Sequence, residues 1–389
     1  MVGKRFLVLD KRTLTMISNI SLYQFKNFAD EAKVALAQMN IIYGCNGKGK
    51  STLLQSILLL SQTMRSDGKI LNLRLNGEFI NLERFDDVIN RFAADDGKQF
   101  KIEITSDGDN ICTVYEADEK PQLARLVNLK INGEDYLSQK SIEDSNLEVN
   151  EQENKPIPTS DIIGLSNLKN IFYISADRKG PCNSVKRNDN ITNNTTGVHG
   201  EHLIQLLYSR LDIQEEITQE MSKIFKGASI KLPSKVDDDE LKLFIDSSDN
   251  SDGFKPSNVG FGYSYVLPII VQVLLAPPKS IIVIENPEAH LHPAAQSRLM
   301  TFLIEQMQKK SLQIFLETHS DHTINGVRLA VKQDVLQPQD VNILFISRDE
   351  YDDRGTPLIE KIKVNKNGAL SQYPDDFMDE WAKQASELL

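Results

Sequence analysis

The segment that most constrains this chain is residues 44–51, Gly-Cys-Asn-Gly-Lys-Gly-Lys-Ser, which fits the pattern G-x-x-x-x-G-K-S. The apolar run 39–43 precedes it, and the helix-forming stretch 52–60 follows it. A strand, a glycine-rich loop and a helix in this order form the context in which the pattern makes a phosphate-binding loop (P-loop). The alternative is a glycine turn before a buried helix, and the flanking context disfavours it. We therefore predict a nucleoside triphosphate site.

The residue types in this loop suit a polyphosphate. Glycines let the backbone N–H groups curl around the phosphates, and the helix N-terminus adds its dipole. A lysine at this position reaches the β- and γ-phosphates, and the following serine offers its hydroxyl to Mg²⁺. ATP and Mg²⁺ are thus the expected cofactors. The expected nucleotide-binding residues of the loop are Gly44, Asn46, Gly47, Lys48, Gly49, Lys50, Ser51 and Thr52.

Composition argues against several other classes of protein. The 389 residues suffice for two or three domains, and no run of eighteen apolar residues predicts a membrane span. The apolar run at 6–9 is too short for a signal peptide. Cys45, Cys112 and Cys182 lie far apart, which disfavours a zinc site or a disulfide framework. We expect a cytoplasmic protein.

Charge is distributed unevenly along the chain. The net charge is −11, which argues against a surface that is basic all over. Residues 1–60 nevertheless carry eight Lys or Arg against three Asp or Glu. Nucleic-acid binding through a local patch therefore stays open, without support from the total charge.

Apolar patterning predicts alternating strands and helices. We expect strands at 16–21, 33–43, 98–104, 170–176, 279–284, 312–316 and 341–347, and helices at 201–226 and 293–309. The polar stretch 137–160 is expected to be a surface loop, and 186–200 a flexible one. Alternating strands and helices indicate an α/β fold with a mainly parallel sheet flanked by helices.

The apolar strand at 280–285, Ser-Ile-Ile-Val-Ile-Glu, ends in a carboxylate. Alone, this pattern also suits an ordinary buried strand. Downstream of a P-loop it predicts a Walker B element, in which Glu285 holds Mg²⁺ directly or through water. Asn-Pro-Glu-Ala-His-Leu-His-Pro follows at 286–293.

Two further segments carry candidate site residues. His319 follows the next apolar strand, where it could contact the γ-phosphate or the attacking water, although a lone histidine there is more often structural. Between the P-loop and Walker B, Gly260, Gly262 and Ser264 open a helix that offers a second anion-binding terminus. A glycine turn before a core helix is the alternative interpretation of that segment.

The order of P-loop, glycine-serine signature, Walker B and switch histidine resembles the ATP-binding-cassette (ABC) ATPase head of the SMC, RecF and OLD group. Within that group the chain is similar to compact bacterial ATPases whose Walker B reads E-[NQ]-P-E-x-H-L-H-P. Further matching segments lie at 23–28, 175–181, 318–322 and 368–378, so the resemblance spans nearly the whole chain.

The resemblance implies an ABC-ATPase head with an N-terminal antiparallel β portion. We expect an N-terminal lobe with the P-loop at 1–120. An inserted helical or irregular lobe follows at 121–255, with a core strand returning near 170–176. The C-terminal lobe, with the signature, Walker B and switch histidine, spans 256–389.

The resemblance also implies a dimer, or a higher oligomer, in which two heads sandwich two ATP molecules. The P-loop and Glu285 of one subunit would meet Gly260, Gly262 and Ser264 of the other, and Lys26 would lie near the base or ribose. Such proteins are common in anti-phage defence operons and include the ATPase subunit of Septu-type systems, which acts with an HNH nuclease. An operon-encoded effector such as a nuclease is therefore an expected partner.

One departure from the usual ABC pattern concerns catalysis. ABC ATPases carry Asp-Glu where this chain has Glu285-Asn286, and an amide cannot accept a proton from water. Either Glu288 takes the role of base with His319, or hydrolysis is slow and the chain works mainly as an ATP-gated clamp. The expected catalytic residues are Glu285, Glu288 and His319, and the expected metal ligands are Ser51 and Glu285.

Alternative functions remain. A metal site formed by Glu288, His290 and His292 explains that loop less well than a dimer-facing role. The sequence lacks the heptads of an SMC coiled coil, and residues 320–389 show no D-x-D cluster of a Toprim nuclease. An ATPase that gates a partner effector, a RecF-like DNA clamp in repair and a non-hydrolysing scaffold stay open, and the acidic charge favours a protein partner over DNA.

Overall fold

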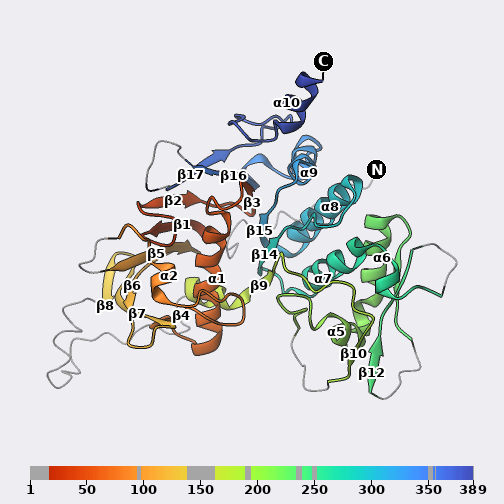
Figure 1. Ribbon diagram of the computed structural model, residues 1–389, viewed down its shortest axis with the longest axis horizontal. Helices are drawn as coiled ribbons and strands as arrows, with labels where there is room; N and C mark the ends of the chain where they lie inside the picture. The colour runs from red at the N-terminus through yellow and green to blue at the C-terminus, as the bar shows by residue number, and fades with distance from the viewer. Residues whose placement is uncertain are drawn as a thin grey trace, which may run out of the picture.

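The computed structural model describes residues 17–93, 98–137, 163–188, 194–233, 239–247, 252–348, 354 and 356–388. Two large sheets and a set of helices organise this part of the chain (Figure 1). The stretch 138–160 and residues 189–193, for which we expected loops, lie outside the described residues.

The first sheet is antiparallel and has the strand order β2-β1-β5-β6-β7-β4, with β8 paired to β7. Its strands are β1 Ile17–Tyr23, β2 Ala32–Ala35, β4 Asn72–Arg74, β5 Gln99–Ser106, β6 Asp109–Ala117, β7 Leu123–Ile131 and β8 Glu134–Leu137. The expected antiparallel portion is therefore present. It continues beyond residue 120, where we placed the end of the first lobe, because β7 pairs with both β6 and β4.

The second sheet has the order β17-β16-β3-β15-β14-β9 and is parallel except for β17. Its strands are β3 Met39–Gly44, β9 Ile171–Ile174, β14 Ile281–Glu285, β15 Gln313–Glu317, β16 Val341–Arg348 and β17 Pro357–Ile362. Strand β15 lies between β3 and β14. The carboxyl ends of these three parallel strands therefore share one edge, which is where α/β sheets bind ligands.

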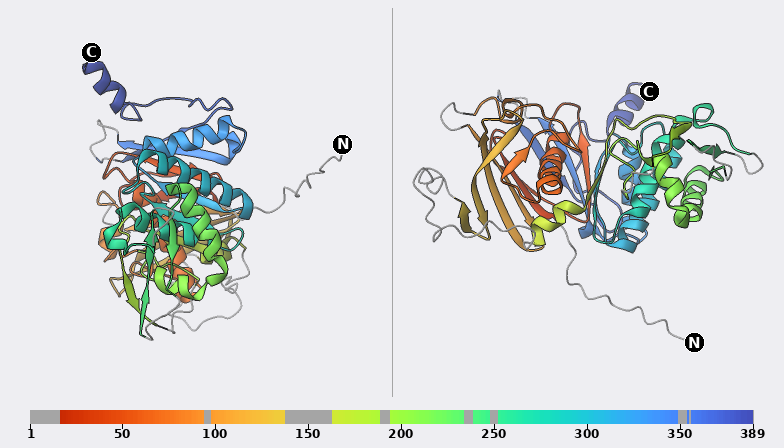
Figure 2. Two further views of the ribbon diagram at one scale, coloured as in Figure 1. Left: turned by 90° about the vertical axis from the view of Figure 1, so that its right-hand side faces the viewer. Right: turned by 90° about the horizontal axis from the view of Figure 1, so that it is seen from below.

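Helix α1 (Lys50–Asp67) lies between the two sheets, as the view from below in Figure 2 shows. Most of its residues are buried, including Leu53, Leu54 and the run Ile57–Leu60. Buried side chains of the parallel sheet alternate in direction: Ile42 packs in the core around α1, and Ile41 packs in the core on the opposite face. A strand with apolar residues on both faces is typical of a buried parallel sheet.

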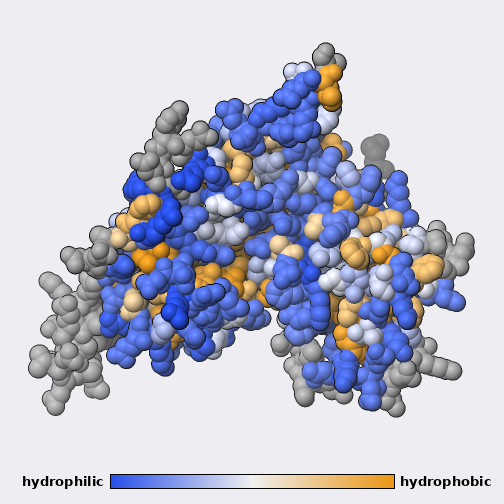
Figure 3. All heavy atoms as spheres, in the orientation of Figure 1, coloured by the Kyte–Doolittle hydropathy of each residue, from blue (hydrophilic) through white to orange (hydrophobic). Residues whose placement is uncertain are grey.

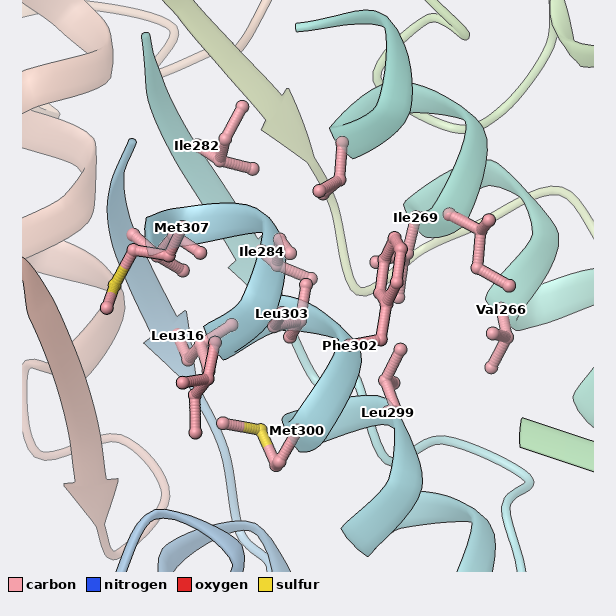
Figure 4. Packing of buried hydrophobic residues seen from close by; sticks show 14 of the residues in the cluster. Val266, Ile269, Ile282, Ile284, Leu299, Met300, Phe302, Leu303, Met307 and Leu316 are labelled. Carbon is pink, nitrogen blue, oxygen red and sulfur yellow. The ribbon is translucent and has the colours of Figure 1, made fainter. Parts of the chain in front are cut away.

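Helices cover the opposite face of the parallel sheet. They are α5 Leu203–Ser209, α6 Gln214–Phe225, α7 Phe261–Leu275, α8 Pro293–Lys310 and α9 Asp321–Lys332. Figure 4 shows Phe302 and Leu303 of α8 packed with Ile269 of α7 and Ile284 of β14. The signature helix and the Walker B strand therefore share one hydrophobic core.

The remaining elements are short. The helical ones are α2 Phe85–Val88, α4 Ile163–Asn167, α10 Glu380–Glu387 and the 3-10 turns η2 Leu168–Asn170, η3 Leu211–Ile213, η4 Pro256–Asn258 and η5 Pro338–Asp340. Two small antiparallel sheets pair β10 Ser184–Lys186 with β12 Glu240–Lys242 and β11 Ser229–Lys231 with β13 Phe244–Asp246. The face seen in Figure 3 is mostly hydrophilic, as expected of a chain whose apolar residues fill two cores.

Two expected elements are divided. The strand expected at 33–43 is β2 and β3, because the chain leaves one sheet and enters the other; the Asn40 side chain bonds to the backbone of Ala37 at this break. The helix expected at 201–226 is α5 and α6. It is interrupted at η3, where Arg210 pairs with Asp212 and Leu211 is 61% exposed instead of continuing the buried face.

The close approach of β3 and β16 predicts a strong effect of Gly44→Ala. Gly44 has φ 146°, and a Cβ there would lie 2.1 Å from the carbonyl oxygen of Ile346. We expect the free energy of unfolding to fall by more than about 2 kcal/mol in urea denaturation.

Gly47→Ala is the matched control for this variant. Gly47 has φ 73°, but nothing lies within 4 Å of its Cβ position, so only backbone strain of about 1 kcal/mol is expected. Equal losses of stability in the two variants would contradict the close packing of β3 on β16.

Candidate nucleotide-binding site

The P-loop connects the end of β3 to the start of α1. Gly44, Gly47 and Gly49 have φ values of 146°, 73° and 107°. These conformations are strained for any residue with a Cβ. At Gly49 a Cβ would also lie 2.9 Å from the Pro357 ring. The glycines of the sequence pattern therefore stand where the loop backbone requires them.

Lys50 is held inside the loop. It is 4% exposed, and its Nζ donates hydrogen bonds to the carbonyl oxygens of Gly44 at 2.9 Å and Cys45 at 2.8 Å. Burial lowers the pKa of Lys50, and the nearby charge of Glu317 opposes that shift. The ammonium group thus lies at the loop, in the position expected of a phosphate-binding lysine.

Two neighbouring pockets share Lys26, Asn27, Asn46 and Gly47. One, of about 320 Å³, is further lined by Gly49, Lys50, Ser51, Thr52, Gln55 and Glu317. The other, of about 380 Å³, is further lined by Lys48, Asp86, Asp87, Ile89, Asn90, Arg91, Arg348 and Arg354. Two adjoining polar pockets, one of them at the P-loop, together leave room for a nucleotide.

Lys26 stands where the two pockets meet. Its φ is 50°, its backbone N–H donates to the Val88 carbonyl at 2.6 Å, and its Nζ donates to Gln55 Oε1 at 2.7 Å. The Gln55 contact ties this side chain to α1. The arginines of the larger pocket, Arg91, Arg348 and Arg354, were not identified from the sequence, because they come from segments far from the P-loop.

Glu317 lies at the end of β15, directly beside the P-loop. Its Oε1 accepts a hydrogen bond from Ser51 Oγ at 3.1 Å, and it is 7% exposed. Burial and the charge of Glu285 raise the pKa of Glu317 to about 7, against the attraction of Lys50. This residue was not expected to be part of the site, although it ends a buried parallel strand as Glu285 does.

Glu285 ends β14 and is in register with Glu317 on the neighbouring strand. Its Oε2 accepts a hydrogen bond from the backbone N–H of Ala176 at 3.1 Å. The two strands therefore bring two carboxylates together at the edge that carries the P-loop.

Arg178 fixes the turn after β14, and it was not among the site residues expected from the sequence. It is 3% exposed; its guanidinium donates to the carbonyl oxygens of Glu285 at 2.7 Å and Asn286 at 2.5 Å, and to that of Ser175 at 3.0 Å. The group lies 5.5 Å from the centre of the Tyr265 ring on α7. Burial lowers its pKa to about 10, so the guanidinium stays charged at neutral pH.

The Glu288 side chain contacts the backbone of His319, the residue with which it was expected to act in catalysis. Glu288 Oε2 accepts from Thr318 Oγ1 and its Oε1 from the His319 backbone N–H, each at 2.8 Å. Burial, then the charge of Lys50, lowers the pKa of His319, which favours a neutral imidazole at neutral pH. Both oxygens of Glu288 are therefore engaged by the end of β15.

The predicted signature residues lie at the start of α7, away from the P-loop. Gly260 is exposed, and a Cβ on Gly262 would lie 2.7 Å from the His290 carbonyl oxygen. Ser264 is 8% exposed, and its Oγ has no hydrogen-bond partner within the described ranges. Neither pocket at the P-loop contains any residue of 260–264. This helix start and the P-loop are thus not brought together in one chain.

The loop after β14 uses its histidines for packing and capping. The His290 ring contacts the rings of Phe261 and Tyr265, and His292 Nδ1 accepts from the Ala294 backbone at the start of α8. Within the described part of the chain, no three His, Cys, Asp or Glu side chains gather as a metal-binding cluster. No described helix is both long enough and apolar enough to cross a membrane.

The donor set at the P-loop suits Mg²⁺. Ser51 and Glu317 supply hard oxygen donors, and Glu317 Oε2 is buried without a hydrogen-bond partner among the described residues. Mg²⁺ accompanying a nucleotide needs only one or two protein ligands, because phosphates and waters complete its shell. These residues therefore fit the metal that the P-loop implies.

Solved structures similar to this chain include heads of SMC proteins. One, an SMC head bound to the C-terminal winged-helix domain of ScpA, has a TM-score of 0.52 at 15% identity, covering 90% of this chain and 98% of that chain. The SMC head from Thermotoga maritima has a TM-score of 0.47 at 13% identity, covering 90% and 99%. An SMC head with an extended coiled coil, bound to the C-terminal domain of ScpA derived from Pyrococcus furiosus, has the same score and identity, covering 96% and 99%. The first likeness supports the fold of an ABC-type ATPase head.

The chain belongs to the family described as "AAA domain, putative AbiEii toxin, Type IV TA system", which matches residues 39–325. A second description, "Protein of unknown function (DUF3696)", matches residues 336–388. No curated protein matches the chain. Family, fold and P-loop together define an ATP-binding ATPase.

The raised pKa of Glu317 predicts a pH dependence of stability. The folded chain holds this proton more tightly than the unfolded chain, because its pKa is about 7 instead of 4.5. The stabilisation is complete below pH 4.5 and is lost as the pH rises through about 7. Between pH 5.5 and 8, wild-type protein should lose about 2 kcal/mol more stability than Glu317→Gln, which cannot ionise. Urea denaturation of both proteins at both pH values measures this, and parallel pH profiles would contradict the assignment.

Proposed function

We propose that this protein is an ABC-type ATPase that dimerises around ATP, hydrolyses it slowly and gates a partner effector such as a nuclease, in anti-phage defence. The observation that carries the proposal is the separation of the two expected halves of the site. The P-loop opens on the face of the parallel sheet that packs on α1, and the start of α7 belongs to the core of the other face.

The P-loop half accounts for nucleotide binding. The loop from Gly44 to Thr52 surrounds the phosphates, and Lys26 lies between them and the larger pocket, which takes the ribose and base. Mg²⁺, when bound, neutralises charge on the β- and γ-phosphates. The start of α7 supplies backbone N–H groups to the ATP of a second copy, as a helix N-terminus does for anions.

Glu288 and His319 form the hydrolytic part of the proposal, with Glu285 as the second carboxylate at the same edge. Asn286 cannot serve as a base, and its Oδ1 is buried without a partner among the described residues. Both oxygens of Glu288 already accept hydrogen bonds, which compete with a hydrogen bond from the attacking water. This arrangement makes turnover slow, so ATP binding, more than hydrolysis, controls the partner effector.

A catalytic role of Glu288 predicts that Glu288→Gln lowers the rate of ATP hydrolysis. The amide keeps one acceptor but cannot take the proton, and a general base typically contributes about 10²–10⁴-fold. Single-turnover hydrolysis with saturating ATP measures the chemical step. An unchanged rate would remove Glu288 from the mechanism, and the nucleotide affinity of the variant serves as the control for folding.

A protein effector is supported over DNA. Of the eight cations in residues 1–60, the four described ones are Lys26, Lys33, Lys48 and Lys50. Three of these line the P-loop pockets, and Lys33 pairs with Glu31. Among the described residues, the positive charges of this segment thus lie mostly at the nucleotide pockets. Duplex DNA would need further cations, outside these pockets, to neutralise its phosphates. A RecF-like DNA clamp remains the alternative.

Two comparisons support the effector part of the proposal. The family description names a putative AbiEii toxin and a Type IV toxin–antitoxin system. The similar SMC head has a domain of another protein, ScpA, bound to it. Purification of the chain with the products of its neighbouring genes, with and without ATP, tests for an effector directly.

The shared site predicts recovery of activity in mixed dimers. Lys50→Ala removes the phosphate-binding lysine. Phe261→Glu places a negative charge on the exposed first residue of α7, where an acid stabilises the helix but repels the partner's triphosphate. Each variant alone should lose ATPase activity. A one-to-one mixture should recover about a quarter of wild-type activity, because half of the dimers have one intact site.

The control for this experiment is Phe261→Gln, which has the same size as the glutamate variant and no charge. It should retain most of its activity. No recovery in the mixture, with mixed dimers demonstrated by mass, would contradict a site shared between subunits.

A further inference from the structure

One buried carboxylate at the P-loop was not among the metal ligands expected from the sequence, which were Ser51 and Glu285. Glu317 ends β15, the strand that lies between the P-loop strand β3 and the Walker B strand β14. It lines the phosphate pocket together with Lys50 and Ser51. Its position is therefore nearer to the P-loop strand, by one strand, than that of Glu285.

The two oxygens of Glu317 have different surroundings. Oε1 accepts a hydrogen bond from Ser51 Oγ, the hydroxyl that a P-loop offers to Mg²⁺. Oε2 is buried and has no hydrogen-bond partner in the part of the chain that is described. Burying such an oxygen without a partner costs free energy, and a cation is the strongest available compensation.

Glu285 is less suited to be the metal ligand. It is half-buried, and its Oε2 accepts from the Ala176 backbone N–H. Among the described residues, no hydrogen bond joins the Glu285 side chain to Ser51. Glu317 accepts one from Ser51 at 3.1 Å. Two carboxylates in register on adjacent strands also repel each other, and a divalent cation relieves that repulsion.

We propose that Glu317, with Ser51, is the protein's direct ligand to the divalent metal that accompanies ATP, and that Glu285 lies outside this direct contact. The inference rests on the proposed nucleotide site. It assigns the carboxylate at the end of β15, instead of the Walker B carboxylate, to the hard oxygen donor set that Mg²⁺ prefers.

The variant Glu317→Gln distinguishes a metal-binding role of Glu317 from a purely structural one. Its amide oxygen still accepts the Ser51 hydrogen bond and fills the same volume, but the anionic charge is gone. Glu317→Asp keeps the charge on a shorter side chain, and Glu285→Gln is the matched control on the neighbouring strand.

The experiment measures nucleotide affinity with a fluorescent ATP analogue that is not hydrolysed, in EDTA and in Mg²⁺, for the full chain. Binding of Mn²⁺ in the presence of the same analogue is followed by electron paramagnetic resonance. Wild-type protein should bind the analogue more tightly in Mg²⁺ than in EDTA. Glu317→Gln should lose about tenfold or more of metal affinity, since even outer-shell partners of a metal contribute that much.

In EDTA, Glu317→Gln should bind the analogue at least as tightly as wild-type protein, because a negative charge beside the phosphates has been removed. Glu285→Gln should keep most of the Mg²⁺ effect, and Glu317→Asp should keep part of it.

The inference is overturned if Glu317→Gln keeps the wild-type Mg²⁺ effect, or if only Glu285→Gln loses it, while wild-type protein still binds the analogue. If wild-type protein binds no nucleotide in either condition, the proposed function is wrong, and this inference, which rests on it, is wrong too.

Discussion

The pairing of β15 with β3 is the contact on which the candidate site depends. It places the end of β15 one strand spacing from the P-loop, so that Ser51 at the start of α1 reaches Glu317. The next pairing, of β14 with β15, adds Glu285 in register. Because all three strands are parallel and adjacent, their carboxyl ends lie side by side at the same edge of the sheet. The concentration of negative charge at this edge is thus a consequence of topology, and the P-loop lysine only partly offsets it.

The phosphate-binding part of the site could be predicted from the sequence because its residues are neighbours along the chain. Residues 44–51 are contiguous, and the glycine positions in the pattern are those at which the backbone has positive φ. Strands β14 and β15 and helix α8 were also predicted close to their observed bounds, since each is a strongly apolar or amphipathic segment. Glu317 could not be assigned in this way. Its importance depends on the insertion of β15 between β3 and β14, and the order of strands in a sheet differs from their order along the chain.

Some elements that were not predicted carry recognisable signals in the sequence. Hairpin β5–β6 turns at Asp107-Gly108, with φ values of 51° and 91°, and hairpin β7–β8 turns at Asn132-Gly133, with 53° and 84°. Asp-Gly and Asn-Gly between alternating residues are strong hairpin signals, so β6, β7 and β8, which were not predicted, could have been found from the sequence. The break between α5 and α6 carries no such signal. Leu211 continues the apolar spacing of a helix, and only tertiary structure leaves it exposed.

Arg178 shows how the acidic half of the site is joined to α7. A guanidinium that is 3% exposed is costly to bury, and here three backbone carbonyl oxygens and the Tyr265 ring offset part of that cost, while Nε has no hydrogen-bond partner among the described residues. Two of those carbonyls belong to Glu285 and Asn286, and Tyr265 lies one turn into α7. The Walker B turn and the start of α7 are therefore held by one buried cation. Since the Ala176 backbone N–H also bonds to Glu285, the loop after β9 fixes both the backbone and the side chain of this acid. The signature helix and the acidic edge thus form one packed unit, which the parallel sheet joins to the P-loop.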